Sequence, residues 1–183
     1  MFLALDLAVS AQALSLVPHP DGGSTSVRGL IATLAGETEA LVVRYTLTAP
    51  LDTLRLPLAS AAPARRDELW RHTCFELFVM GADGVYHEFN FSPSGDWQAY
   101  RFEAYRRRGG TQPATAPRLD IRRNPTTLTL DARVPRAALP THPVNAALTA
   151  VIEDAAGVLS YWALHHAPGK PDFHHPAGFT VAL

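Results

Sequence analysis

The chain has 183 residues, enough for one domain with a sizeable core, and 47% of them are hydrophobic, an ordinary share for a globular protein. Its 16 basic and 17 acidic residues give a formal net charge of −1, without the basic excess expected of a nucleic-acid-binding protein. The single cysteine excludes an intrachain disulfide, which fits a reducing compartment. Because no internal repeat or linker interrupts the sequence, we expect residues 1–183 to form a single domain.

The first residues, Met1 to Leu16, are apolar enough to resemble an export signal, and Ala11 to Ala13 resembles a cleavage site. However, no Lys or Arg precedes the apolar run, and Asp6 interrupts it. No other stretch approaches the ~18 apolar residues that a membrane-spanning helix needs. We therefore expect a cytoplasmic protein without a membrane partner, and keep export as the alternative.

Fifteen prolines and twelve glycines punctuate the chain at short intervals, and the runs between them are rich in Val, Leu, Thr, Tyr and Phe. This pattern is typical of an all-β protein and predicts a two-sheet antiparallel β-sandwich. In chain order, we expect strands at 13–17, 26–34, 39–48, 54–58, 73–80, 85–91, 97–105, 119–123, 127–134, 147–154, 158–165 and 179–183. One helical turn is expected at 136–139.

The clearest hairpin joins the strands at 73–80 and 85–91 through a Gly-Ala-Asp-Gly turn. Three polar residues, Glu76, Glu88 and Asn90, interrupt its apolar pattern. They either grip the hydroxyls of a ligand or form a structural network with partners such as Arg101, Arg106 or a tryptophan indole, because buried carboxylates demand partners. Whether the two glutamates share a face depends on the hairpin register, which the sequence leaves open.

Trp70, Trp97 and Trp162 are the tryptophans of the chain, and Trp70 and Trp162 lie at strand ends beside loops, where binding sites tend to form. A flat indole suits the apolar C–H face of a sugar ring. The alternative is that these side chains fill the ends of the core, since large aromatic residues dominate protein cores.

The segment 161–175 contains four histidines, one lysine and one aspartate. Such residues can coordinate a metal, but the segment has no cysteine and no recognised ligand spacing, so we predict no metal site. We expect His165, His174 or Lys170 to face a ligand instead. Haem would need an axial ligand such as Met80 or His72, and no spacing signature marks one.

Enzymatic motifs are absent from the sequence: it has no phosphate loop, dinucleotide fingerprint or nucleophile elbow. Cys74 lies inside an expected strand, where a free cysteine behaves as a small hydrophobic residue. A glycosidase that uses Glu76 and Glu88 as its carboxyl pair stays an alternative.

Several motifs together resemble bacterial DOMON-like proteins, which are similar to family-9 carbohydrate-binding modules. They are Leu69-Trp70, TCFELF at 73–78, YHEFNFSP at 86–93 and YWALH at 161–165. The resemblance covers nearly the whole chain and implies a jelly-roll β-sandwich, in which two tryptophans enclose a sugar; Trp70 and Trp162 are the matching positions. Some relatives bind calcium or haem, but the chain offers no acidic cluster near its N-terminus beyond Asp21 and no matching pair of haem ligands.

We therefore expect a non-enzymatic module that binds a small molecule, with a carbohydrate as the first choice, and that needs no cofactor. Trp70 and Trp162 would stack on the sugar ring. Hydrogen bonds or charge would come from Glu76, Glu88, Asn90, His165, Lys170 and His174. The alternatives are a haem-binding electron-transfer module, a protein-interaction domain and, last, a glycosidase.

Overall fold

The structure, a computed structural model, describes residues 12–22 and 26–183. Most of the apolar run that resembles an export signal therefore lies outside the described residues. The strands are β1 (Leu14–Pro18), β2 (Gly29–Gly36), β3 (Ala40–Thr48), β4 (Cys74–Gly81), β5 (Tyr86–Phe91), β6 (Trp97–Ala104), β7 (Arg107–Arg108), β8 (Arg118–Asn124), β9 (Thr127–Pro135), β10 (Pro143–Glu153), β11 (Leu159–Ala163) and β12 (Val181–Ala182). Single 3-10 turns are η1 (Leu51–Thr53), η2 (Leu69–Arg71), η3 (Arg136–Ala138) and η4 (Pro176–Gly178). Within the described ranges, no helix is long and apolar enough to span a bilayer.

The described strands form one continuous antiparallel path in the order β7-β6-β5-β4-β10-β11-β1-β2-β3-β9-β8, and β12 pairs with β10. β1 joins the two halves of this path, because Leu14–Leu16 pair with β2 while Val17 and Pro18 pair with β11. The prediction of an all-β antiparallel protein is confirmed, whereas two separate sheets are not resolved in the strand pairing.

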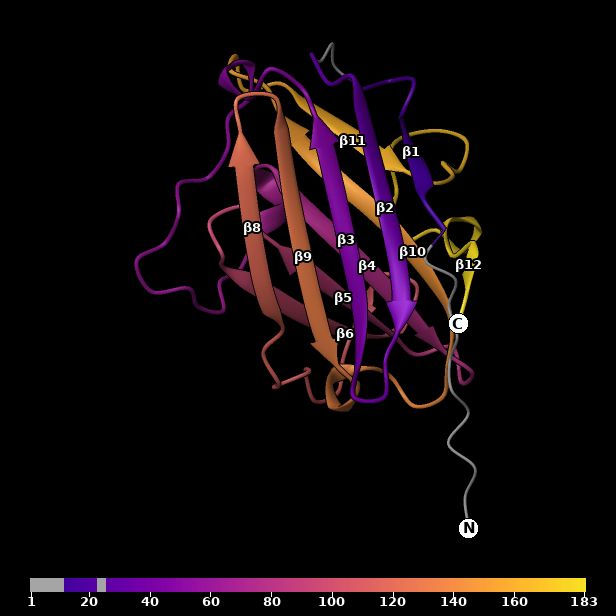
Figure 1. Ribbon diagram of the computed structural model, residues 1–183. Helices are drawn as coiled ribbons and strands as arrows, with labels where there is room; N and C mark the ends of the chain where they lie inside the picture. The colour runs from indigo at the N-terminus through magenta and orange to yellow at the C-terminus, as the bar shows by residue number, and fades with distance from the viewer. Residues whose placement is uncertain (1–11, 23–25) are drawn as a thin grey trace.

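The two halves of the path face each other across the main core. In Figure 1, β2, β3, β8 and β9 lie in front of β4, β5, β6 and β10. Alternate residues of each strand point into the space between them, as the period-2 pattern of the sequence requires. The largest contributors are Leu30, Leu34, Tyr45, Leu47, Leu128 and Leu130 from one half, and Phe75, Leu77, Phe89, Phe91 and Leu148 from the other.

The strands β4 and β5 are buried on both faces. One face of β4 places Phe75, Leu77 and Val79 in the main core. The opposite face, called the outer face below, presents Glu76 and Phe78, and a second apolar cluster gathers there around Phe78, Tyr86, Tyr100, Phe102 and Phe179. This double burial explains why polar residues interrupt an otherwise apolar hairpin sequence.

Most expected strands are confirmed to within a few residues, including the hairpin of β4 and β5, whose turn ends at Gly84 with φ 80°. The strand expected at 54–58 is wrong: Leu54 makes one isolated bridge with Asp154, and the chain then leaves the sheet. Pro57 lacks a backbone N–H and cannot extend a hydrogen-bonded ladder. The two-residue strand β7 was not expected.

Candidate functional site

A cavity of about 390 Å³ opens on the outer face of the β4–β5–β6 layer. Its floor comes from the strands themselves: Glu76, Phe78, Glu88 and Phe102. Its walls come from η2, from β11, from the turn and short strand that follow β6, and from the C-terminal segment: Trp70, Tyr161, Arg106, Arg108, Pro171, Phe173 and His174. Segments far apart in the sequence therefore meet at one site.

The hairpin register decides the position of the two glutamates. Glu76 pairs with Asn90, and Phe78 pairs with Glu88. Because residues directly opposite each other on antiparallel strands point to the same face, both carboxyl groups lie on the outer face as diagonal neighbours. The structure thus settles the question that the sequence left open.

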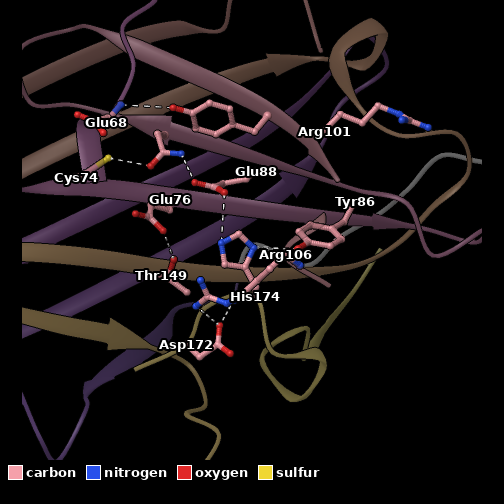
Figure 2. Close-up of polar contacts among 12 residues, drawn as sticks. Glu68, Cys74, Glu76, Tyr86, Glu88, Arg101, Arg106, Thr149, Asp172 and His174 are labelled. Atoms are coloured by element: carbon pink, nitrogen blue, oxygen red, sulfur yellow. Dashed lines mark hydrogen bonds and ion pairs between the residues drawn. The ribbon is translucent and has the colours of Figure 1, made fainter. Parts of the chain in front are cut away.

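Glu88 lies at the centre of a buried polar network (Figure 2). Its Oε1 accepts a hydrogen bond of 2.6 Å from Asn90 Nδ2, and Asn90 Oδ1 in turn accepts one of 3.5 Å from the Cys74 thiol. The other oxygen, Oε2, lies 3.7 Å from His174 Nε2. Burial raises the pKa of Glu88 to about 7, although the bond from Asn90 opposes the shift.

His174 reaches this network from the C-terminal segment. The Tyr86 hydroxyl accepts a hydrogen bond of 3.0 Å from the Arg106 backbone N–H and lies 2.9 Å from His174 Nδ1. The Tyr86 hydroxyl can therefore donate its own hydrogen to His174 Nδ1. The imidazole hydrogen of His174 then lies on Nε2, which faces Glu88. Burial lowers the pKa of His174 to about 4, so the ring is neutral at pH 7.

Glu76 is the second carboxyl group that lines the cavity. The residue is only 2% exposed, and its Oε2 accepts one hydrogen bond of 3.3 Å from the Thr149 hydroxyl. Its Oε1 has no hydrogen-bond partner among the described residues. Every fully buried side-chain N or O atom of the described chain does have a partner, so Oε1 is not fully buried and is open to the cavity. Burial, and then the charge of Glu88, raise the pKa of Glu76 well above its usual value. This shift favours the protonated acid, which can both donate and accept a hydrogen bond.

The turn after β6 supplies two arginines. Arg106 adopts a left-handed conformation with φ 53°, and its Nη2 lies 2.7 Å from Asp172 Oδ1. Arg108 places its guanidinium carbon 3.7 Å from the centroid of the Tyr100 ring and 5.7 Å from that of Phe102. The cavity therefore combines carboxyl groups, guanidinium groups and aromatic rings.

Four of the residues that the sequence proposes for the site line the cavity: Trp70, Glu76, Glu88 and His174. Trp70 is 40% exposed, which leaves its indole accessible. Asn90 lies directly behind them, fully buried against Glu88. The structural network expected as the alternative is also present, but Asn90 and Thr149 form it rather than Arg101, whose guanidinium pairs with Glu103.

Trp162 does not lie at the cavity, where it would have to be to enclose a sugar together with Trp70. It is 5% exposed, packs in the main core, and donates its indole N–H to Ser160 Oγ at 2.9 Å. On β11 successive side chains alternate between faces, so Tyr161 reaches the cavity and Trp162 points to the opposite side. The structure therefore does not bring Trp70 and Trp162 together, and Tyr161 is the aromatic residue that β11 contributes to the cavity.

His165 and Lys170 are exposed and are not among the residues that line the cavity. The other histidines of the segment have separate partners: His166 Nε2 lies 2.9 Å from the Val17 carbonyl, and His175 Nδ1 accepts a bond from the Ala177 N–H. In the described part of the chain, no group of three or more His, Cys, Asp or Glu residues is placed to hold a metal ion.

The residues named as haem ligands are also dispersed. His72 Nδ1 lies 2.8 Å from Glu153 Oε2, and Met80 packs against the apolar cluster of the outer face. Neither belongs to the residues that line the cavity.

Sequence reasoning missed Tyr161, Phe173 and Arg108 as lining residues, and considered Arg106 only as a structural partner. The Arg-Arg-Arg run at 106–108 was a signal, because a cluster of like charges needs solvent or an anionic partner. Its position over the cavity depends on the left-handed turn at Arg106, which the sequence does not reveal.

Comparisons with known proteins bear on the fold. The sequence matches no protein family model and no curated protein. A candidate carbohydrate-binding protein from Bacteroides uniformis superposes with a TM-score of 0.61 at 15% identity, over 92% of this chain and 83% of that one. A family-9 carbohydrate-binding module from Caldicellulosiruptor kristjanssonii, solved with cellotriose, gives a TM-score of 0.53 at 10% identity, over 88% and 80% of the two chains. At these identities the likeness establishes the fold alone: the chain is all-β and antiparallel, with a fold like that of family-9 carbohydrate-binding modules.

Proposed function

We propose that the outer-face cavity binds a carbohydrate without chemical turnover, in a two-sheet sandwich of the jelly-roll type. The observation that carries the proposal is the shared lining of the cavity: an accessible indole at Trp70 and a phenol at Tyr161 beside the buried carboxyl groups of Glu76 and Glu88. A sugar presents both chemistries, an apolar C–H face for aromatic rings and an edge of hydroxyl groups for polar side chains.

The two buried carboxyl groups favour a ligand rich in hydroxyl groups. Oε1 of Glu76 has no protein partner, and a buried polar group costs free energy until it is hydrogen-bonded. A sugar hydroxyl satisfies such a group, whereas an apolar ligand leaves it unpaired, so the site discriminates between the two. The carbohydrate-binding descriptions of the two structural neighbours agree with this proposal.

Burial of both carboxyl groups favours binding over glycoside hydrolysis. A glycosidase needs one ionised carboxylate beside one protonated acid, with environments that push their pKa values apart. Here the same cause raises the pKa of both: burial brings Glu88 to about 7 and raises Glu76 well above its usual value. The environments therefore do not separate the two groups into an ionised nucleophile or base and a protonated acid.

The test is isothermal titration of the chain with neutral and acidic monosaccharides and with short oligosaccharides. We expect saturable binding to at least one sugar. Trp70→Ala should weaken it by about tenfold or more, because an aromatic contact of this kind is worth about 1 kcal/mol or more on top of the buried area. Leu58→Ala is the matched control: Leu58 is an exposed apolar residue outside the cavity, and its replacement should leave affinity unchanged. No binding to any sugar, or equal affinity in Trp70→Ala, would overturn the proposal.

A further inference from the structure

The Arg108 guanidinium lies at the cavity and forms no ion pair with a described carboxylate, although its charge acts on Glu88 and opposes the rise in that group's pKa caused by burial. No hydrogen bond or ion pair of its side chain is present in the described part of the chain, and its contacts are with the rings of Tyr100 and Phe102. A guanidinium carries five N–H donors in one plane. Stacking on an aromatic ring leaves the edge of that plane, and therefore the donors, free for a ligand.

The rings beneath Arg108 are themselves fixed. The Tyr100 hydroxyl donates a hydrogen bond of 2.9 Å to Asp67 Oδ1, and Phe102 stacks on Tyr86 with ring centroids 4.7 Å apart and planes 2° from parallel. The backbone of β7 also pairs with β6, which anchors Arg108 at its Cα. A donor group held in place before binding loses less conformational entropy when the ligand arrives.

The other charges around the cavity compensate Arg108 only in part, through Glu88. Arg106 is paired with Asp172 at 2.7 Å. His174 is neutral at pH 7, because burial lowers its pKa to about 4. Burial raises the pKa of both floor carboxyl groups, that of Glu88 to about 7, and so disfavours a negative charge on either. The lining is therefore cationic on balance, and an anionic substituent on a ligand would complete it.

We propose that the sugar recognised by this cavity carries an anionic group, a carboxylate or a phosphate ester, which binds the stacked guanidinium of Arg108. The inference rests on the proposed carbohydrate function and specifies its ligand class. The sugar ring lies against Trp70 and Tyr161 with its hydroxyl groups toward Glu76, and its anionic substituent faces the turn after β6. Carboxylate and phosphate oxygens match the fork of an arginine in a bidentate arrangement.

The experiment compares sugars that differ only in charge. Isothermal titration at pH 6.5 would use three hexoses (glucose, galactose and mannose), the corresponding hexuronates, and the hexose 6-phosphates. The hexuronate and phosphate arms separate the two sources of negative charge. We expect at least one acidic member to bind about tenfold or more tightly than its neutral hexose, since hydrogen bonds to charged groups contribute on the order of ten- to a hundredfold in affinity.

Two variants assign this preference to one residue. Arg108→Gln should remove it, leaving the acidic and neutral sugars within about twofold of each other. Arg107→Gln is the matched control: it removes the same charge from the neighbouring exposed residue, which does not line the cavity, and it should keep the preference.

Three results would overturn the inference. Equal or tighter binding of neutral hexoses would reject the anionic ligand while the carbohydrate function stands. A preference for acidic sugars that survives Arg108→Gln would reject Arg108 as its origin. Binding of acetate or inorganic phosphate as tightly as the acidic sugars would reject a saccharide, and the proposed function would fail with it.

Discussion

The two faces of the hairpin formed by β4 and β5 are both buried, but one is mainly apolar and the other also carries carboxyl groups. The inner face carries Phe75, Leu77 and Phe89 and packs against the other half of the fold. The outer face carries the Glu76 and Glu88 carboxyl groups, and side chains from distant segments cover it around a cavity. The same strands therefore contribute an apolar core on one side and, on the other, the polar floor of the proposed binding site.

The two faces differ in how the burial of their side chains affects the stability of the fold. A buried apolar residue needs no further explanation, because its removal from water stabilises the fold. A buried carboxyl group destabilises the fold unless partners or a ligand satisfy it. Glu88 has such partners within the chain, while Glu76 keeps one oxygen open to the cavity. This cost on the outer face supports the proposal that the ligand binds there.

The largest expected effect lies on the inner face. Leu77→Ala removes a fully buried side chain from the main core and should lower the free energy of unfolding by about 2–5 kcal/mol, the usual cost of such a cavity. Urea denaturation followed by circular dichroism would measure it. Folded Leu77→Ala protein should still bind sugar with nearly normal affinity, because Leu77 does not line the outer-face cavity. A cost below about 1 kcal/mol would contradict the division between the two faces.

On the outer face, removal of a buried group should stabilise the protein. The pKa of Glu88 is raised from 4.5 to about 7 by burial, so between these values the folded state binds a proton that the unfolded state releases. Stability from this group is present below pH 4.5 and is lost as pH rises to about 7. Glu88→Gln should therefore be more stable than the parent at pH 8, by on the order of 3 kcal/mol at most, and the advantage should vanish near pH 4.

Urea denaturation of the two proteins at each pH measures the Glu88 contribution together with its coupling to Glu76, whose pKa the Glu88 charge raises, because groups that do not interact with Glu88 cancel. The lowered pKa of His174 makes stability fall as pH decreases through 6.5 toward 4 in both proteins, so the parent at each pH is the necessary reference. Glu103→Gln is the control, since it replaces an exposed carboxyl group of β6 rather than a buried one and should give no gain in stability at pH 8. A stability advantage of Glu88→Gln that does not depend on pH would refute the burial argument.

The smallest effect expected concerns Cys74, which tests how tightly the outer face is closed beside the cavity. Its thiol is buried, donates to Asn90, and has a pKa raised by burial, and all three features suppress thiolate chemistry. A colorimetric thiol reagent should label native protein only slowly and should label it fully in urea. Rapid stoichiometric labelling without denaturant would show that solvent reaches the network behind Glu88.

Much of the fold could be predicted from alternation and turn chemistry. The β4–β5 hairpin follows from two period-2 runs around a Gly-rich turn, and the polar residues within it mark the strands that bear the site. The sequence could not choose between Tyr161 and Trp162, because a shift of one residue exchanges the faces of a strand. Nor could it place Arg108, whose position depends on the left-handed turn at Arg106 and on the ring of Tyr100.

Tryptophan fluorescence titrated with hexuronates in the parent chain and in Trp70→Phe tests the central claim most directly. Trp70 is 40% exposed and lines the cavity, whereas Trp97 and Trp162, at 9% and 5%, belong to the core. The account predicts a saturable fluorescence change in the parent chain that disappears in Trp70→Phe. A change that persists in Trp70→Phe, or no change in the parent chain with any acidic or neutral sugar, would contradict a carbohydrate site on the outer face.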